Sequence, residues 1–258
     1  MTDVLVAVPA RDEQRQVGEC LASVATALRQ ARAAGVAERV AVAVAVHRSS
    51  DGTAAAVEES LAAMPDLEAY HHVDEDSATV GEVRHHLVSA ACAALGLEAQ
   101  PDRWLLSTDA DSVVPPDWVT AMLAHADTTA AFCVAGLVDL EGWQGHPAAA
   151  TAYEQIVRDG LDGDGHRHVY AANLAVRLDA YAAAGGFPFV LHGEDHGLVS
   201  RVRDLGGRVL PVHSPVVRTS GRMPGRARQG LGDLLLSLTS GHGPRPPLSH
   251  AGCACCVG

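Results

Sequence analysis

The chain has 258 residues, 48% of them hydrophobic, and a formal net charge of −12 at pH 7. This length and apolar content fit one packed α/β domain and argue against fibrous and disordered classes. The acidic balance argues against a nucleic-acid partner, because binding to a phosphate backbone needs clustered cations. All 19 Lys and Arg positions are arginine, so mechanisms that need a lysine amine, such as Schiff-base chemistry, are excluded.

Short apolar runs typical of strands alternate along the chain with Ala-rich helical patterns. This alternation predicts a mainly parallel sheet with helices on both of its faces. Strands are expected at 4–8, 40–46, 67–73, 104–108, 131–138, 169–176 and 208–212. Helices are expected at 13–34, 53–63, 81–95, 116–125, 148–157 and 196–205.

Three segments interrupt this pattern. Residues 137–168 carry several Gly, His and acidic residues and are interpreted as an insertion or lid. Residues 231–238 form an apolar, helix-like run that we expect to pack on the domain, the alternative being contact with a membrane-borne acceptor. Residues 1–240 are thus predicted to fold as one domain, and residues 241–258, with three cysteines in no standard zinc spacing, to form a disordered tail.

No apolar run approaches the length of about 20 residues that a bilayer-spanning helix needs. The first residues enter a strand pattern at once, without a basic leader. The sequence therefore predicts a cytoplasmic protein of bacterial type, with no stable membrane insertion.

Two acidic residues, Asp109 and Asp111, follow the apolar strand expected at 104–108. Side chains alternate along a strand, so both acids are expected on one side, at the carboxyl edge where open α/β sheets bind ligands. Two neighbouring carboxylates favour a hard divalent ion such as Mg²⁺ or Mn²⁺, which fills its remaining positions with water and phosphate oxygens. The alternative interpretation is a solvated turn whose acids have no ligand.

Other motifs follow the strands in a fixed order: Pro9–Glu13 after the first, Ser49–Thr53 after the second, and Gly193–Asp195 at the start of the last helix. Together with the Asp109–Asp111 pair, this ordered series resembles the family 2 glycosyltransferases of the GT-A fold over residues 4–222. The segments Ala171–Leu174 and Gly185–Phe187 add to the resemblance. It implies a GT-A, Rossmann-like catalytic domain that uses a nucleotide-diphospho-sugar donor.

The resemblance also implies which residues contact the nucleotide. Arg84 would pair with the diphosphate through its planar fork, the alternative being a solvated surface arginine. Asp51 matches an acid of the second loop, although we expect it to act mainly as an N-cap. Where the family has an acid that reads the base, this chain has Val46, so His47 is an alternative source of a hydrogen bond. The implied contacts are Pro9, Arg11, Glu13, His47, Asp51, Arg84 and Asp109.

For the chemistry, the resemblance places Asp111 on the metal and Asp195 as the base that takes the proton of the acceptor hydroxyl. Glu194 would orient Asp195 or contact the donor sugar. His213 is a candidate third metal ligand, the alternative being that Arg218 and Arg222 clamp the diphosphate. The implied reaction is a single, inverting displacement without a covalent intermediate.

The sequence leaves the acceptor open between a small molecule, a glycan and a lipid-linked sugar. One rival function is a sugar-1-phosphate nucleotidyltransferase, which normally needs a Gly-rich loop with a lysine. The other is a catalytically decayed nucleotide-sugar-binding protein on the same scaffold. Four retained acids argue against decay, because their mutual repulsion must be offset.

Overall fold

The computed structural model describes all residues except 1, 164, 224, 226–229 and 241–258. The tail and cysteine cluster expected at 241–258 therefore lie outside the described residues. Eight strands form the central sheet. Their spatial order across the sheet is β3 (Glu68–Asp74), β2 (Val40–His47), β1 (Asp3–Ala10), β4 (Arg103–Ser107), β9 (Leu174–Arg177), β6 (Cys133–Glu141), β10 (Val209–Ser220) and β5 (Ser112–Val113).

Six of these strands run in the same direction. The strands β1, β2, β3 and β4 pair in parallel, as do β6 and β10, whereas β9 is antiparallel between β4 and β6, and β5 is antiparallel to β10. The predicted mainly parallel α/β sheet is therefore confirmed. The strand expected at 169–176 is shorter, because a 3-10 turn, η1 (Ala171–Asn173), occupies its first half.

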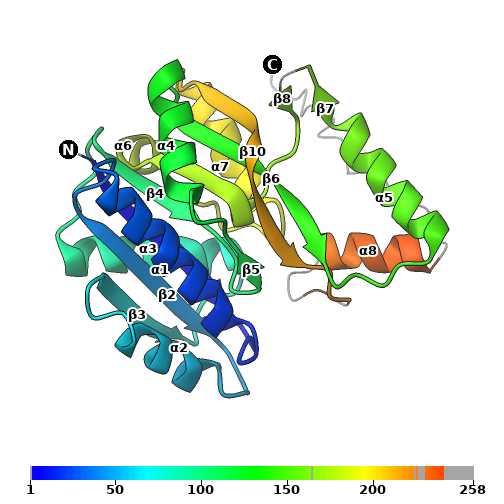
Figure 1. The fold of residues 1–258 in the computed structure, drawn as a ribbon, viewed down its shortest axis with the longest axis horizontal. Coiled ribbons are helices and arrows are strands. Elements are labelled where there is room, and N and C mark those ends of the chain that lie inside the picture. Colours follow the sequence, from blue (N-terminus) through cyan, green and yellow to red (C-terminus); the bar gives the residue numbers. More distant parts are fainter. Residues whose placement is uncertain (1, 164, 224, 226–229, 241–258) are drawn as a thin grey trace, which may run out of the picture.

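Helices cover both faces of the sheet (Figure 1). Alternate residues of β1 point to opposite faces, so that Val4, Val6 and Val8 belong to one buried cluster, and Leu5 and Ala7 belong to the other. The first cluster packs under α1 (Val17–Ala33), α2 (Thr53–Ala62) and α4 (Trp118–Thr129). The second packs under α3 (Val80–Leu95), α6 (Leu178–Ala183) and α7 (Glu194–Asp204).

The N-terminus of α3 is fixed by its own sequence. The Thr79 side chain accepts a hydrogen bond from the backbone N–H of Glu82 at 3.2 Å, and the Glu82 carboxylate accepts one from the N–H of Ala78 at 2.7 Å. The first bond satisfies an N–H group that a helix start leaves without a partner, and the second ties the residue before the N-cap to the first turn. The cap sets where α3 begins and so determines which of its residues face the sheet edge.

The segment interpreted as an insertion is folded and forms an arm beside the sheet (Figure 1). The arm consists of α5 (Pro147–Asp159), β7 (Leu161–Asp162), β8 (Gly165–His166) and α8 (Leu231–Thr239). Leu235 and Leu238 of α8 are buried, and α8 packs against α5. Among the described residues, no helix has the length and apolarity needed to cross a membrane.

Candidate active site

The parallel strands end at one edge of the sheet, and the loops that follow β1 and β2 are joined there by hydrogen bonds. The carboxylate of Asp12 accepts from the backbone N–H of Ser50 at 2.7 Å. The N–H of Glu13 donates to the hydroxyl oxygen of Thr53 at 2.7 Å. The two loops that were predicted to contact the nucleotide therefore form one connected unit at the sheet edge.

Asp51 belongs to this unit, but it is not the N-cap of α2. The N-cap position is Gly52, one residue later. The Asp51 carboxylate nevertheless accepts from the backbone N–H of Thr53 at 3.0 Å and from that of Gln14 at 3.2 Å. Burial opposes ionisation of Asp51, but these hydrogen bonds outweigh it and hold the pKa of Asp51 below its usual value. Asp51 thus supports the start of α2 from the position before the N-cap and also holds the first loop.

The other expected nucleotide contacts of the first two strands differ in accessibility. Arg11 is exposed just beyond β1, and Pro9 is half-buried within that strand. His47 is buried at the end of β2, where Nδ1 lies 3.1 Å from the carbonyl oxygen of Asp74. Because that oxygen can only accept, Nδ1 is the donor in this contact. Val46 lies in the core and cannot take the place of a base-reading acid.

Arg84 of α3 joins the two acidic motifs. Its Nη1 donates to the hydroxyl of Ser107 at 2.7 Å, its Nη2 donates to Asp109, and its Nε lies 3.5 Å from an oxygen of Glu194. Burial opposes the charged form, but the charges of Asp109 and Glu194 more than offset this and raise the pKa of Arg84. The side chain is only 3% exposed. The alternative of a solvated surface arginine is therefore wrong, and the fork that was predicted to pair with the diphosphate contacts Asp109 and Glu194 inside the protein.

The first turn of α3 can bring Arg84 there because Gly81 has no side chain. A Cβ atom at Gly81 would lie 2.2 Å from the carbonyl oxygen of Pro188 and 2.9 Å from Cβ of Glu194. Gly81→Ala is expected to push α3 away from α7 and to lower the free energy of unfolding, measured with urea, by about 1–3 kcal/mol. Gly18→Ala in α1 is the control, because its nearest atom would be Ser60 Oγ at 3.7 Å and alanine favours a helix interior. Equal effects of the two substitutions would contradict this prediction.

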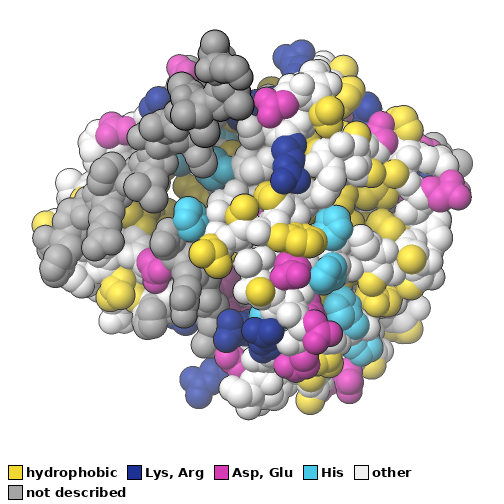
Figure 2. Space-filling view, turned by 180° about the vertical axis from the view of Figure 1, so that it is seen from behind, with side chains coloured by type: hydrophobic (Ala, Val, Ile, Leu, Met, Phe, Trp, Pro, Cys, Tyr) yellow, Lys and Arg dark blue, Asp and Glu magenta, His cyan; other side chains and the backbone are white. Residues whose placement is uncertain are grey.

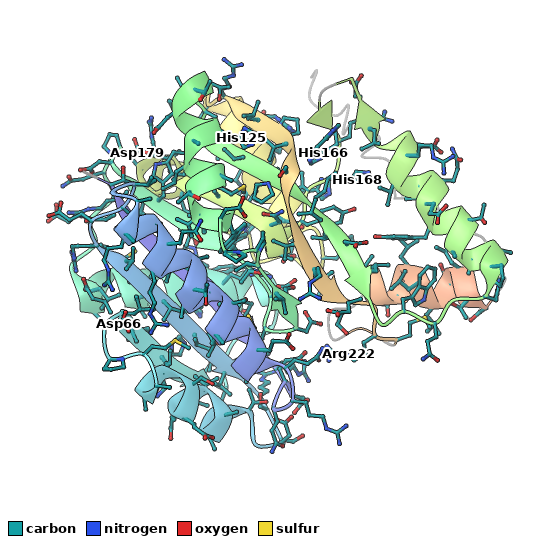
Figure 3. All side chains as sticks on the ribbon, viewed as in Figure 1. Asp66, His125, His166, His168, Asp179 and Arg222 are labelled. Carbon is teal, nitrogen blue, oxygen red and sulfur yellow. The ribbon has the colours of Figure 1, made fainter. Side chains whose placement is uncertain are left out.

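A second arginine, Arg222, lies against the other members of the acidic set. Its two terminal nitrogens contact the two carboxylate oxygens of Glu13 at 2.6 and 2.9 Å, and Nη2 also lies 3.2 Å from Asp111. Nη1 donates to the side-chain oxygen of Gln16 at 3.0 Å. Figure 3 shows Arg222 beyond the lower end of β10. Of the two arginines considered for a clamp, only Arg222 reaches this site, because Arg218 is half exposed and pairs with Glu141.

The surroundings of Asp111 disfavour the charged form of its carboxyl group, and Arg222 compensates for this only in part. Burial and the charges of Asp109 and Glu13 raise the pKa of Asp111 to about 7, against the opposing charge of Arg222. A cavity of about 380 Å³ opens beside Asp111, which is large enough for part of a ligand. The cavity is lined by Gln16, Glu19, Asp111, Ser112, Val113, Glu141, Gly142, Ser220 and Arg222.

These residues fit a metal that is shared with a ligand. The described residues contain no group of three or more His, Cys, Asp or Glu that would enclose a metal ion. Mg²⁺ and similar hard ions commonly use one or two protein carboxylates and complete their shell with water and substrate phosphates. A partly compensated carboxylate next to a cavity, as at Asp111, provides such a partial shell.

The structure does not bring His213 to Asp111. Nε2 of His213 lies 3.0 Å from the carbonyl oxygen of Gly165 in β8, and its ring stacks on His166. Thr219, six residues further along β10, pairs with Ser112 beside Asp111. At about 3.3 Å per strand residue, His213 lies on the order of 15–20 Å away. Figure 3 accordingly shows His166 well apart from Arg222, which lies beyond the lower end of β10.

Asp195 and Glu194 begin α7 and differ in burial. Glu194 is 8% exposed, and burial raises its pKa although the charge of Arg84 acts in the opposite direction. Asp195 is half-buried; one of its oxygens accepts from the N–H of Ala171 at 3.1 Å and the other from the N–H of His196 at 2.7 Å. These two bonds orient the Asp195 carboxylate. Because a carboxylate has about four acceptor positions, it can still accept a hydrogen bond from another donor.

Asn173 is a residue whose role the sequence did not reveal. Its side-chain nitrogen donates to the carbonyl oxygens of Leu137 and Pro215, both at 2.8 Å, and its oxygen accepts from Nε1 of Trp118 at 2.8 Å. Asn173 is fully buried and ends the turn that carries the Ala171 N–H. The segment at 171–174 contributes to the family resemblance, but a buried amide that links β6, β10 and α4 leaves no periodic signal in a sequence.

No protein-family model and no curated protein sequence matches the chain. Solved structures do resemble it. S. aureus TarS in complex with UDP-GlcNAc has a TM-score of 0.63 at 15% identity, covering 89% of this chain and 61% of that one. Mannosyltransferase PcManGT from Pyrobaculum calidifontis, with GDP-Man and Mn²⁺, has a TM-score of 0.63 at 17% identity, covering 86% and 58%.

A further match is GalNAc-T7 with UDP, GalNAc and Mn²⁺, at a TM-score of 0.60 and 13% identity, covering 93% of this chain and 48% of that one. The chain therefore has the GT-A, Rossmann-like fold of nucleotide-sugar glycosyltransferases. It spans about 60% of the length of the TarS and mannosyltransferase chains that it matches.

Proposed function

We propose that the chain is a metal-dependent, inverting glycosyltransferase that moves a sugar from a nucleotide-diphospho-sugar to an acceptor hydroxyl. The main support is that two arginines gather four carboxylates at the ligand-binding edge of a GT-A fold. Arg84 holds Asp109 and Glu194, and Arg222 holds Glu13 and Asp111. Structural neighbours that carry GDP-Man or UDP are recorded with Mn²⁺, which supports Mn²⁺ or Mg²⁺ as the cofactor.

In this proposal Asp111 would hold the metal, which would supply positive charge next to the leaving diphosphate. Asp109, fixed by Arg84, faces the ribose. The Arg222 guanidinium contacts Asp111 at 3.2 Å, and it pairs with the diphosphate when a donor enters. The first loop, with Arg11 and the Glu13–Arg222 pair, forms the nucleotide side of the site.

Asp195 accepts the proton of the acceptor hydroxyl in this mechanism. The hydroxyl oxygen forms a bond to the anomeric carbon as the bond from that carbon to the diphosphate oxygen breaks. Attack comes from the face opposite the leaving group, so the configuration inverts and no covalent enzyme intermediate is needed. Glu194 stays beside Arg84 and positions the start of α7. His213 takes no part in the proposed metal site.

The proposal predicts that a donor stabilises the protein through Asp111. UDP-GlcNAc or GDP-Man with Mn²⁺ at about 100 times its Kd is expected to add about 2.7 kcal/mol to the free energy of unfolding. Asp111→Ala should remove the metal-dependent part of this gain, which is measured by thermal unfolding with and without Mn²⁺. Asp127→Ala, at an exposed position of α4, is the control and should respond like the wild type. If no nucleotide or nucleotide sugar stabilises the wild type with any divalent metal, the proposal is abandoned.

A further inference from the structure

A run of exposed apolar residues lies just before the proposed base. Phe189, Val190 and Leu191 are 55%, 40% and 77% exposed, in the loop that leads into α7. Of the eight large apolar residues that are exposed in the described part of the chain, these three are consecutive. Single exposed apolar residues need no explanation, but a contiguous exposed patch marks an interaction site.

Pro188 packs this loop closely against a glycine on each of the two neighbouring helices. Pro188 fills the space above Gly81 of α3, where its carbonyl oxygen lies 2.2 Å from the position that a Cβ would take. It also fills the space above Gly197 of α7, where its Cγ lies 2.7 Å from such a position. The N–H of Val190 donates to the carbonyl oxygen of Pro188 at 3.0 Å. The apolar side chains are therefore exposed by an ordered backbone.

Histidines flank the patch on one side. The Phe189 ring contacts the rings of His85 and His86 edge-on, at centroid distances of 5.2 and 5.7 Å. Figure 2, which shows the molecule from behind the view of Figure 1, has apolar and histidine side chains next to each other near the middle of the face. Residues 188–193 include no carboxylate, so the patch presents flat rings and aliphatic groups without fixed negative charge.

The patch also lies within reach of the proposed base. Leu191 and Asp195 are separated by four residues, which span at most about 14 Å even when fully extended. A molecule whose hydroxyl meets Asp195 therefore needs to extend by no more than this distance for its apolar group to contact the loop. The net charge of −12 disfavours docking on an anionic bilayer, which argues for a single amphiphilic molecule as the occupant.

We propose that Phe189, Val190 and Leu191 form the subsite for an apolar aglycone of the acceptor, so that the acceptor is an amphiphile with its hydroxyl at Asp195. This inference rests on the proposed glycosyltransferase function, because it takes Asp195 as the residue that receives the hydroxyl proton. The apolar group gains free energy by leaving water and packing on the exposed side chains of Phe189, Val190 and Leu191.

The test compares methyl and octyl β-glucoside, which share the sugar and differ in the aglycone. Octyl glucoside, below its micelle concentration, is expected to shift the backbone amide NMR signals of Val190 and Leu191, whereas methyl glucoside is not. With a donor that the protein turns over, kcat/KM for octyl glucoside should exceed that for methyl glucoside by about tenfold or more. The variant Val190→Ser/Leu191→Ser should lose both differences and keep the affinity for the donor.

Leu205→Ser is the matched control, because Leu205 is 60% exposed at the other end of α7. It should keep the octyl preference. Equal binding of the two glucosides by the wild type overturns the inference, and so does an unchanged preference in the double variant. Two other results would also overturn it, if the wild type shows no preference for octyl glucoside. They are a changed oligomeric state in the double variant, and loss of its sedimentation with phosphatidylcholine vesicles.

These outcomes separate the inference from the proposed function. If no nucleotide sugar binds with Mn²⁺, the glycosyltransferase proposal fails, whatever the glucosides do. If a donor binds and its sugar is transferred, but the octyl chain gives no advantage, only the aglycone subsite fails.

Discussion

Asp195→Asn is expected to lower the turnover number of sugar transfer by about 10²–10⁴-fold and to leave donor binding nearly unchanged. An amide keeps the size of the carboxylate but cannot take the proton of the acceptor hydroxyl, and general-base catalysis typically contributes a factor of this size. The measurement is kcat with saturating donor and acceptor, together with the donor Kd by calorimetry. The donor affinity serves to show that the site is still assembled.

Asp204→Asn provides the control for this substitution, because Asp204 is exposed at the last turn of the same helix. It should retain wild-type turnover. A loss of less than about tenfold in Asp195→Asn would exclude Asp195 as the base. Glu194→Gln would then be the next variant to measure, since Glu194 is the adjacent carboxylate.

Arg84→Met is expected to lower the free energy of unfolding by about 3–5 kcal/mol. The methionine fills much of the same volume, but Asp109 and Glu194 lose the cation that they share, and Ser107 loses a hydrogen bond. Removing one partner of a buried ion pair leaves an uncompensated charge, which costs far more than losing an exposed pair. Urea unfolding with linear extrapolation measures the change.

Arg29→Met is the comparison for Arg84→Met, because Arg29 pairs with Asp66 where both side chains are about 40% exposed. Its loss is expected to cost about 0–1 kcal/mol. If the two substitutions lower the free energy of unfolding by the same amount, the buried network around Arg84 does not stabilise the site. Adding Glu194→Gln to Arg84→Met should recover part of the stability, since it removes one of the uncompensated charges.

The fold could be predicted from the sequence because its strands are short apolar runs separated by helical patterns. The relative direction of the strands could not be predicted in the same way. The strand β9 is antiparallel to both β4 and β6, and apolar periodicity carries no information about the direction of a neighbouring strand. The strand β5 has two residues, which is too short for alternation to be visible. The strand expected at 208–212 continues to Ser220, which places His213 in mid-strand and Arg222 just beyond the end.

The acidic residues of the site could be located from the sequence, but their partners could not. Asp109 and Asp111 follow β4 as expected, yet they do not share a cation in this structure, because each contacts its own arginine. Arg84 is 25 residues from Asp109, and Arg222 is 111 residues from Asp111. Spacing along one strand indicates which side chains share a side. It says nothing about which distant residue meets them.

The Asn173 side chain connects the buried core of the protein to the candidate base, Asp195. Trp118 holds Asn173, Asn173 ends η1, and the first N–H of that turn holds an oxygen of Asp195. A Cβ atom at Gly136 would lie 2.2 Å from the Asn173 side-chain nitrogen, so the space around this amide is closed. Substitutions at Trp118 and Gly136 are therefore expected to disturb Asp195, although both positions are buried in the interior.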